Sequence, residues 1–294
     1  VVRYCEGGRW VENVIDDLFP CAQIPTMDKG FLAFSGARGN KLFVPLLEKL
    51  LAKNRGCYEH IEGGRPGEGL RIFTGWPTMV LHLQYSTQTD HDINRALQLN
   101  AARSKQGLVR SDSILTDPED YAKTIALRMD ANCPFISDEY VWIRMRNAQE
   151  QGMICAAACG HSNQILEKCG GDQAKMRQHY REVGLSPSHC YAIMQTIECK
   201  DGLRLVQFRN PWGTGRTWNG AYGKNSSLWT KDLIEEIGAG KLQLEAQGMF
   251  WMNLDHVLQY FVSCAVSSWR HGWHEERFTV ALPNTYLLRF SSVF

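Results

Sequence analysis

Two residues with complementary chemistry, His189 and Asn210, lie 21 positions apart on the two sides of a predicted β-hairpin. Two runs rich in apolar residues, from Cys190 to Cys199 and from Leu203 to Arg209, flank the turn signal Lys200-Asp201-Gly202. Antiparallel pairing of these runs brings the histidine and the asparagine to the open end of the hairpin, within side-chain reach of each other. An amide oxygen that accepts a hydrogen bond from an imidazole fixes the tautomer and orientation of the ring. The pair can therefore act as a general base and its orienting partner.

Each of these residues also has an ordinary structural explanation. A lone histidine at a strand end needs no chemical role, and Asn210 before Pro211 is typical of a residue that starts a turn. Trp212 and Trp218, in the same segment, fit a hydrophobic core. The hairpin-matched spacing of the histidine and the asparagine favours the catalytic interpretation.

The same segment, taken with two others, resembles the calpain family of papain-like cysteine endopeptidases. The motifs that carry the resemblance in the second half are Gly184-Leu185, His189-x-Tyr191, Arg209-Asn210-Pro211-Trp212-Gly213, Trp218-x-Gly220 and Gly248-x-Phe250-Trp251-Met252. A block near the start adds Gly8-x-Trp10-Val11-Glu12, Ile15-Asp16-Asp17-Leu18-x-Pro20, Leu47-Glu48-Lys49, Gly56-Cys57-Tyr58-Glu59, Gly63-Gly64 and Phe73-Thr74-Gly75. These blocks occur in the family's order, and only residues from about 78 to 135 lack a counterpart.

The resemblance implies a role for each residue of the hairpin end. His189 would be the general base, Asn210 its orienting partner, and Trp212 a shield over their hydrogen bond beside the cleft. In this family the nucleophilic cysteine lies upstream in a Gly-x-Cys-Trp segment, a few residues after an oxyanion-hole glutamine. Neither is in this sequence, which opens at Val1 and stops at Phe294. We therefore expect a fragment cut at both ends, inactive by itself.

The fold implied by the resemblance is α+β, with a papain-like two-lobed cysteine protease core whose N-terminal lobe is incomplete. Residues 1–75 would be the remainder of the first lobe, and residues 76–266 the second lobe with His189 and Asn210. An insertion is expected at about 78–135, where the sequence is polar and poorly periodic. Residues 267–294 would start a C2-like β-sandwich domain, and further domains are expected outside the sequence.

Local patterns predict the elements that must position the site. Residues 1–75 favour two strands followed by one helix. The apolar face of this helix starts at Phe43, and the helix stops at Gly56. The glycine-rich tract 63–69 after it is typical of an irregular connection. The remaining patterns predict helices from Pro118, from Ser137 to Gly152, around 233–237 and over 254–261, and strands over 153–159 and in 277–294.

Composition excludes several classes of function. The net charge of +1 and the pI of about 7.7 give no electrostatic basis for binding nucleic acid or an anionic membrane. No apolar run approaches the roughly 18 residues that a transmembrane helix needs. Ten cysteines in 294 residues do not form a disulfide scaffold, so we expect reduced thiols and a cytoplasmic protein. The resemblance to calpains implies that its substrates are polypeptides.

The cysteines within the sequence do not supply a convincing nucleophile. A reactive thiol needs an electropositive, partly open niche, such as a helix start beside a histidine. Cys190 adjoins His189, but neighbours on a strand face opposite sides. Cys159, followed by Gly160-His161, ends a buried strand instead of opening a helix, and Cys57 matches a structural cysteine of the family.

Metal ligands are not expected at the usual positions either. Cys155, Cys159 and His161 lack a zinc spacing, and no Cys-x-x-Cys pair exists. The family gates its lobes with calcium held by carboxylates. The corresponding positions in this sequence hold Lys41, Thr217, Lys224, Gln247 and Met249. We therefore expect no calcium at these core sites and no other cofactor.

The sequence thus indicates a calpain-type cysteine endopeptidase of intracellular proteolysis. Two alternatives stay open. A catalytically inactive calpain-like scaffold or regulator fits the lost calcium ligands, whereas the retained His189, Asn210 and Trp212 argue against it. A papain-like transferase such as a transglutaminase pairs its histidine with aspartate, so Asn210 counts against that class.

Overall fold

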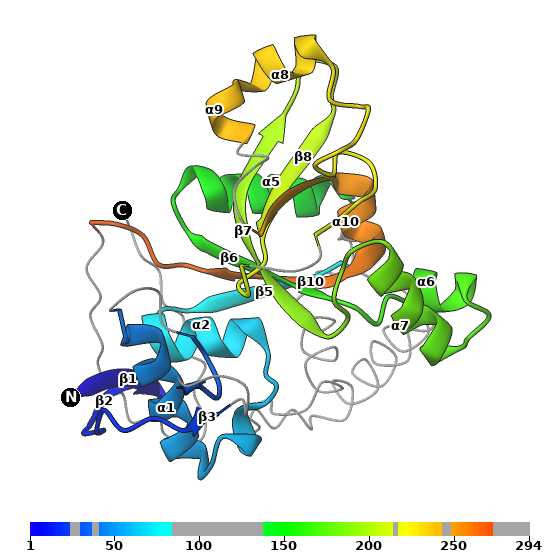
Figure 1. The fold of residues 1–294 in the computed structure, drawn as a ribbon. Helices are drawn as coiled ribbons and strands as arrows, with labels where there is room; N and C mark the ends of the chain where they lie inside the picture. The colour runs from blue at the N-terminus through cyan, green and yellow to red at the C-terminus, as the bar shows by residue number, and fades with distance from the viewer. Residues whose placement is uncertain (24–29, 37–40, 84–137, 214–216, 243–247, 273–294) are drawn as a thin grey trace, which may run out of the picture.

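The central element is a six-stranded antiparallel sheet in the order β5-β10-β6-β7-β8-β9 (Figure 1). The computed structural model describes residues 1–23, 30–36, 41–83, 138–213, 217–242 and 248–272. The strands are β5 (Thr78–His82), β10 (Phe261–Ser267), β6 (Ile154–Cys159), β7 (His189–Glu198), β8 (Arg204–Arg209) and β9 (Met249–Asn253). The expected mixture of helix and sheet is confirmed.

Aromatic side chains from four different strands form the core next to the start of β7. Phe208 stacks on Phe261 with ring centroids 4.6 Å apart, and Tyr191 meets Phe250 edge to face at 5.5 Å. All four are at most 1% exposed. Such pairs add a preference of ring geometry to the free energy gained by burying large apolar surfaces, so they fix how the strands align.

Helices cover this sheet. α5 (Asp138–Glu150) lies against β6 and β7 and buries four side chains at helical spacing, namely Val141, Trp142, Met145 and Ala148. α10 (Leu254–Tyr260) contacts β8, β9 and β10, and α6 (Asn163–Lys168) and α7 (Gln173–Glu182) follow β6. α8 (Lys231–Ile237) and α9 (Ala239–Leu242) lie above the β7–β8 hairpin in Figure 1. No described helix is long and apolar enough to cross a bilayer.

The N-terminal part contains two small hairpins and two helices. β1 (Val2–Glu6) pairs with β2 (Arg9–Asn13), and β3 (Cys21–Ala22) pairs with β4 (Phe31–Leu32). α1 (Phe43–Arg55) is followed by the short 3₁₀ helix η1 (Glu59–Ile61) and by α2 (Pro66–Thr74). In Figure 1, α2 lies between β1 and the large sheet, and it contacts strands of both.

Close packing of α2 on side chains of β5 explains why the helix carries a glycine in its first turn. A Cβ at Gly67 would lie 3.1 Å from Val80 Cγ2 and 3.3 Å from Thr78 Cγ2, so even alanine would require these side chains of β5 to shift by a few tenths of an ångström. Thr74 Oγ1 also lies 3.2 Å from Ser267 Oγ at the end of β10.

The proposed lobe boundary at residue 75 stays a prediction, because α2 joins structures on both sides of it.

Several sequence predictions are confirmed, with ends shifted by a few residues. The helix predicted to stop at Gly56 is α1, the helix predicted from Ser137 to Gly152 is α5, and the strand predicted over 153–159 is β6. The hairpin predicted around Lys200-Asp201-Gly202 is β7–β8, closed by a 2.8 Å bond from Cys199 N to Leu203 O.

Four local predictions are wrong or incomplete. The tract 63–69, predicted as an irregular connection, contains the start of α2, because proline at the first helical position fits a helix start. Residues 78–82, taken as the irregular start of an insertion, form β5. Phe261, assigned to a helix, begins the central strand β10, and α6 and α7 were not predicted. The helix expected from Pro118, the strands expected in 277–294 and the rest of the expected insertion lie outside the described residues, except Leu83.

The loop before β7 yields a prediction with a matched control. Gly184 (φ +83°) and Gly170 (φ +67°) are both left-handed, but a Cβ on Gly184 would lie 2.0 Å from Thr217 O whereas one on Gly170 meets nothing within 4 Å. Gly170→Ala should lower the free energy of unfolding by about 1–2 kcal/mol, the cost of left-handed backbone alone. Gly184→Ala should lower it by at least about 3 kcal/mol, because the backbone of Thr217 must also move. Urea unfolding of the two variants measures this, and equal losses would contradict the packing described for Gly184.

Candidate active site

The pairing of β7 with β8 decides which residues meet at the open end of the hairpin. Ala192 pairs with Arg209, and an irregularity between Ile193 and Gln195 shifts the register by one residue. The ladder ends at the Ala192–Arg209 pair, and the turn that follows β8 brings Trp212 to His189. The two side chains stack there, with ring centroids 3.8 Å apart and an interplanar angle of 28°.

The expected contact between His189 and Asn210 is present. His189 Nε2 lies 3.0 Å from Asn210 Oδ1, and the asparagine is only 2% exposed. The backbone N–H of Trp212 donates to the same oxygen over 3.1 Å. A backbone N–H can only donate, so the amide must present its oxygen at this position. The proton of a neutral His189 ring therefore belongs on Nε2, and Nδ1 carries the lone pair.

The backbone of Asn210 is held on both sides. Its N–H donates to Gly248 O over 2.8 Å, and its carbonyl accepts from Gly213 N over 3.0 Å. Gly248 has φ +74°, and a Cβ there would lie 3.0 Å from Asn210 O and 3.1 Å from Gly213 Cα. Glycine at this position therefore lets the residue before β9 clamp the asparagine.

Aromatic side chains shape the surroundings of the histidine. Trp212 is 64% exposed, so one face of the imidazole is covered by an indole that itself faces solvent. Tyr191, which is fully buried, meets the ring edge to face at 4.9 Å and accepts a 2.9 Å bond from Ser186 N through its hydroxyl. The tyrosine thus ties the loop before β7 to the core beneath His189.

Partial burial sets the protonation of His189. Desolvation lowers the pKa of the imidazole below its usual value, and the hydrogen bond to Asn210 opposes this in part. The neutral ring therefore prevails at neutral pH. Among the described residues Nδ1 has no hydrogen-bond partner, so its lone pair is available to take a proton.

The cysteines of the described chain do not complete the site. No hydrogen bond joins a described cysteine to His189. Burial raises the pKa of Cys190 to about 11 and also raises the pKa of Cys159, so both are protonated thiols at neutral pH. The ring contact between His189 and Tyr191 puts these two on one face of β7, so Cys190 between them faces the other side.

Candidate metal ligands are scattered. Among the described residues no three histidine, cysteine, aspartate or glutamate side chains gather as a possible metal site. Of the expected calcium positions, Lys41 precedes α1, Thr217 packs by its carbonyl against Gly184, and Met249 is buried in β9. Lys224 lies in the loop before α8, and Gln247 lies outside the described residues. The absence of calcium from these positions stays a prediction.

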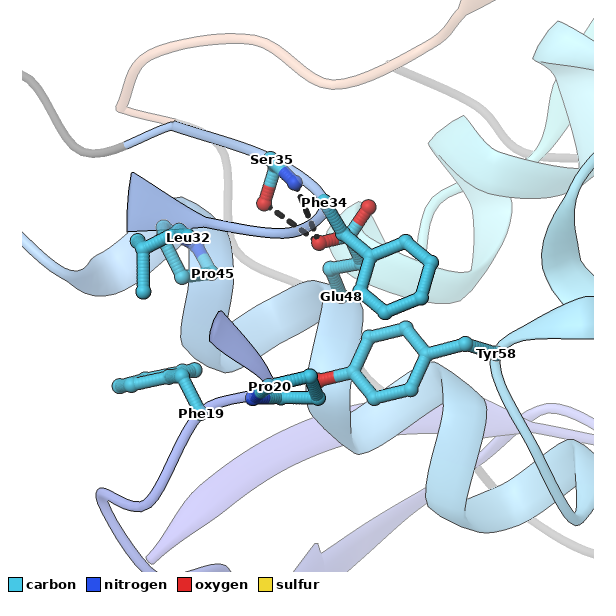
Figure 2. A pocket seen from close by; sticks show the side chains of 8 residues that line it. All are labelled: Phe19, Pro20, Leu32, Phe34, Ser35, Pro45, Glu48 and Tyr58. Atoms are coloured by element: carbon cyan, nitrogen blue, oxygen red, sulfur yellow. Dashed lines mark hydrogen bonds between the residues drawn. The ribbon is translucent and has the colours of Figure 1, made fainter. Parts of the chain in front are cut away.

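A small hollow in the N-terminal part shares no lining residue with the histidine site. Figure 2 shows Phe34 stacked on Tyr58, with ring centroids 4.2 Å apart, and Glu48 Oε2 accepting bonds from Ser35 N and Oγ. All lining residues fall within residues 19–58, and the hollow has room for no more than about one water molecule.

Comparison with known proteins identifies the family. The family model described as "Calpain family cysteine protease" matches residues 1–268. The chain belongs to the calpain family. Over 90% of its own length, the chain is 26% identical to the calpain-type cysteine protease DEK1 of Arabidopsis thaliana, and the match covers 9% of that relative. The identity is also 26% to Calpain-5 of Caenorhabditis elegans and to a calpain of Schistosoma mansoni, of which the matches cover 35% and 26%. The chain thus spans a minor part of each of these relatives.

Sequence reasoning found the histidine, the asparagine and the tryptophan but missed what holds them. The clamp by Gly248 and the donation from Trp212 N–H depend on backbone geometry, for which the only signal was the glycine before the Phe250-Trp251 block. It also missed the contact of His161 with Ser188, because the sequence suggests only two roles to weigh for His161, partner of a possible nucleophile and ligand of a zinc site.

The geometry predicts the tautomer and titration of His189. Because none of the described residues gives the ring a thiolate partner, neutral His189 in the 294-residue chain should carry its proton on Nε2 and titrate below about 6.5. Because the folded-state pKa is lower than the unfolded one, the unfolded state binds more protons between these two values. The contribution of His189 to stability is therefore complete above about pH 6.5 and is lost as the pH falls through that window. Nuclear magnetic resonance of ¹⁵N-labelled histidine measures both properties, and an Nδ1–H tautomer or a pKa above 6.5 would contradict the account.

Proposed function

We propose that this chain is part of a calpain-type cysteine endopeptidase of intracellular proteolysis in the cytoplasm, in which His189 is the catalytic base and Asn210 its orienting partner. The observation that carries the proposal is the 3.0 Å contact from His189 Nε2 to Asn210 Oδ1, an oxygen also bound by Trp212 N–H. The nucleophile in this proposal is a cysteine encoded upstream of Val1. The substrate class is polypeptide, bound in extended form between two lobes, residues 1–75 with the upstream segment and residues 76–266.

The chemistry follows from the free nitrogen of the ring. Nδ1 takes the thiol proton, and the thiolate attacks the scissile carbonyl carbon to form a C–S bond. The imidazolium then gives its proton to the leaving amine as the C–N bond breaks. In the second half, Nδ1 takes a proton from water as the water oxygen attacks the thioester carbon. The C–S bond then breaks, and the imidazolium returns the proton to the departing sulfur, which restores the thiol and the neutral ring. Asn210 stays bound to Nε2–H throughout, so the ring neither flips nor changes tautomer.

Trp212 supports this cycle without transferring a proton. Its indole covers the imidazole and limits the approach of water to the Nε2–Oδ1 hydrogen bond, and its N–H fixes the amide oxygen. A hydrogen bond shielded from water is stronger than an exposed one, so the ring orientation is better defined. Donors for the developing oxyanion would come from the upstream segment, as backbone N–H groups and a glutamine.

An inactive calpain-like scaffold remains the second candidate. The residues at the family's calcium positions favour it, since they suggest that the usual switch is not maintained. The assembled histidine–asparagine pair favours the protease, because a binding protein has no chemical use for it. The residue at the upstream cysteine position distinguishes the two, since a cysteine supports the protease and another residue the scaffold. A transglutaminase-like transferase is disfavoured, because Asn210 occupies the position of its aspartate.

Substitution of the base tests the protease directly. In the full-length protein, His189→Ala should lower peptidase activity at least about 10³-fold, because no other group takes the thiol proton. Asn210→Ala should lower it about 10- to 100-fold, because the base remains but loses its orientation. Hydrolysis of a fluorogenic peptide measures both.

Asn219→Ala is a matched control for these substitutions. Asn219 is another asparagine held by a side-chain bond, from Nδ2 to Glu182 O over 2.8 Å, but it does not contact the imidazole. Its substitution should leave the rate nearly unchanged. Undiminished hydrolysis by His189→Ala would refute the assigned role of the histidine.

Calcium control provides an independent test. Lysine at positions 41 and 224 adds positive charge where the family places carboxylates, so the chain should bind no calcium tightly at these core sites. Isothermal titration of calcium into the 294-residue chain should show no stoichiometric heat of tight binding. A tight one-to-one isotherm would overturn the prediction.

A further inference from the structure

A hydrogen bond next to the proposed base joins two loops that have no role in the mechanism so far. His161 Nε2 lies 2.7 Å from Ser188 Oγ. Ser188 directly precedes His189, and His161 lies two residues after Cys159, which pairs with His189 in the sheet. The bond therefore connects the end of β6 to the start of β7 at the residue adjoining the base.

Both residues of this bond have an unusual backbone. His161 has φ 61° and Ser188 has φ 58°, a left-handed conformation that side chains with a Cβ rarely adopt. Such residues persist where their surroundings hold them, and they concentrate at functional sites. Between the loops, a Cβ on Gly160 would lie 2.5 Å from Ser188 N and 2.9 Å from Pro187 Cα, so the two backbones are already in contact.

The loop that carries His161 is fixed from behind. Gly160 N–H donates to Tyr260 O over 3.3 Å, and Ser162 Oγ donates to Gln259 O over 2.6 Å. The hydroxyl of Tyr180 donates to Tyr260 O over 2.9 Å and accepts from Ser162 N over 3.3 Å. His161 thus stands on a loop tied to the junction of α10 and β10, and Ser188 is the residue that it can hold in place.

We propose that His161 is a positioning residue that, through its hydrogen bond to Ser188, sets the backbone conformation from which His189 reaches Asn210. The effect on kcat that follows from this inference rests on the proposed protease function, whereas the effect on the conformation of His189 does not. A serine hydroxyl can donate to a ring nitrogen or accept from one, so the bond forms with either tautomer of His161. Both side chains are exposed, so the bond acts on local geometry and adds little to global stability.

Kinetics of the full-length protein test the proposal. His161→Ala and Ser188→Ala should each lower kcat about 2- to 10-fold with KM and Tm nearly unchanged, the effect expected from losing one hydrogen bond that acts on the base. The double variant should be no slower than either single variant, because both remove the same bond. His161→Gln, whose amide has a similar reach, should restore part of the rate.

His60→Ala is the matched control. His60 is also an exposed histidine with a ring nitrogen bonded to a neighbour, Arg55 O at 2.7 Å, but it lies in the N-terminal part. Its substitution should leave kcat unchanged. Additive losses in the His161 and Ser188 double variant would overturn the proposal, since two independent effects do not describe one bond.

A readout that needs no activity separates this inference from the proposed function. The imidazole ¹⁵N shifts of His189 should move in His161→Ala and in Ser188→Ala but not in His60→Ala. If the wild-type protein proves to have no peptidase activity, the protease proposal fails while these shifts still decide the positioning role. His189 shifts that match the wild-type protein in both variants overturn the inference.

Discussion

The chemistry of this site depends on a single acceptor atom, Asn210 Oδ1, that receives two hydrogen bonds. One comes from His189 Nε2 and the other from the backbone of Trp212. The backbone donor decides which end of the amide faces the imidazole, and the amide oxygen then decides the tautomer of the ring. A rotated amide would present its N–H₂ group to Nε2, move the ring proton to Nδ1 and remove the lone pair that a base needs.

Contacts between residues far apart in the chain determine the position of that oxygen atom. The β7–β8 hairpin and the turn after β8 bring the histidine and the indole together, and the glycine before β9 holds the asparagine backbone. Tyr191 beneath the ring belongs to an aromatic core built from β7, β8, β9 and β10. A change that displaces one of these rings would therefore alter the packing around Tyr191 beneath the imidazole.

The local part of this arrangement could be predicted from the sequence. A turn signal between two apolar runs specifies a hairpin, and the positions of His189 and Asn210 about the turn then follow from antiparallel geometry. The clamp by Gly248 could not be predicted, because it joins residues 38 positions apart through backbone atoms alone. The apolar spacing over residues 254–261 predicts a helix that includes Phe261, but α10 passes into β10 at that residue with no intervening loop. The start of α2 is not predicted, because glycines on both sides of Pro66 are typical of a loop. The packing of Gly67 against β5, which favours a glycine there, is visible only in the structure.

The central claim is that His189, oriented by Asn210, activates a thiol supplied from outside these 294 residues. The most direct measurement is the labelling rate of the full-length protein by a peptide-like thiol electrophile, with the modified cysteine located by mass spectrometry. The account predicts fast labelling of one cysteine upstream of Val1, slowed strongly by His189→Ala and less by Asn210→Ala. Labelling of a cysteine within this sequence, or a rate that does not depend on His189, would contradict it.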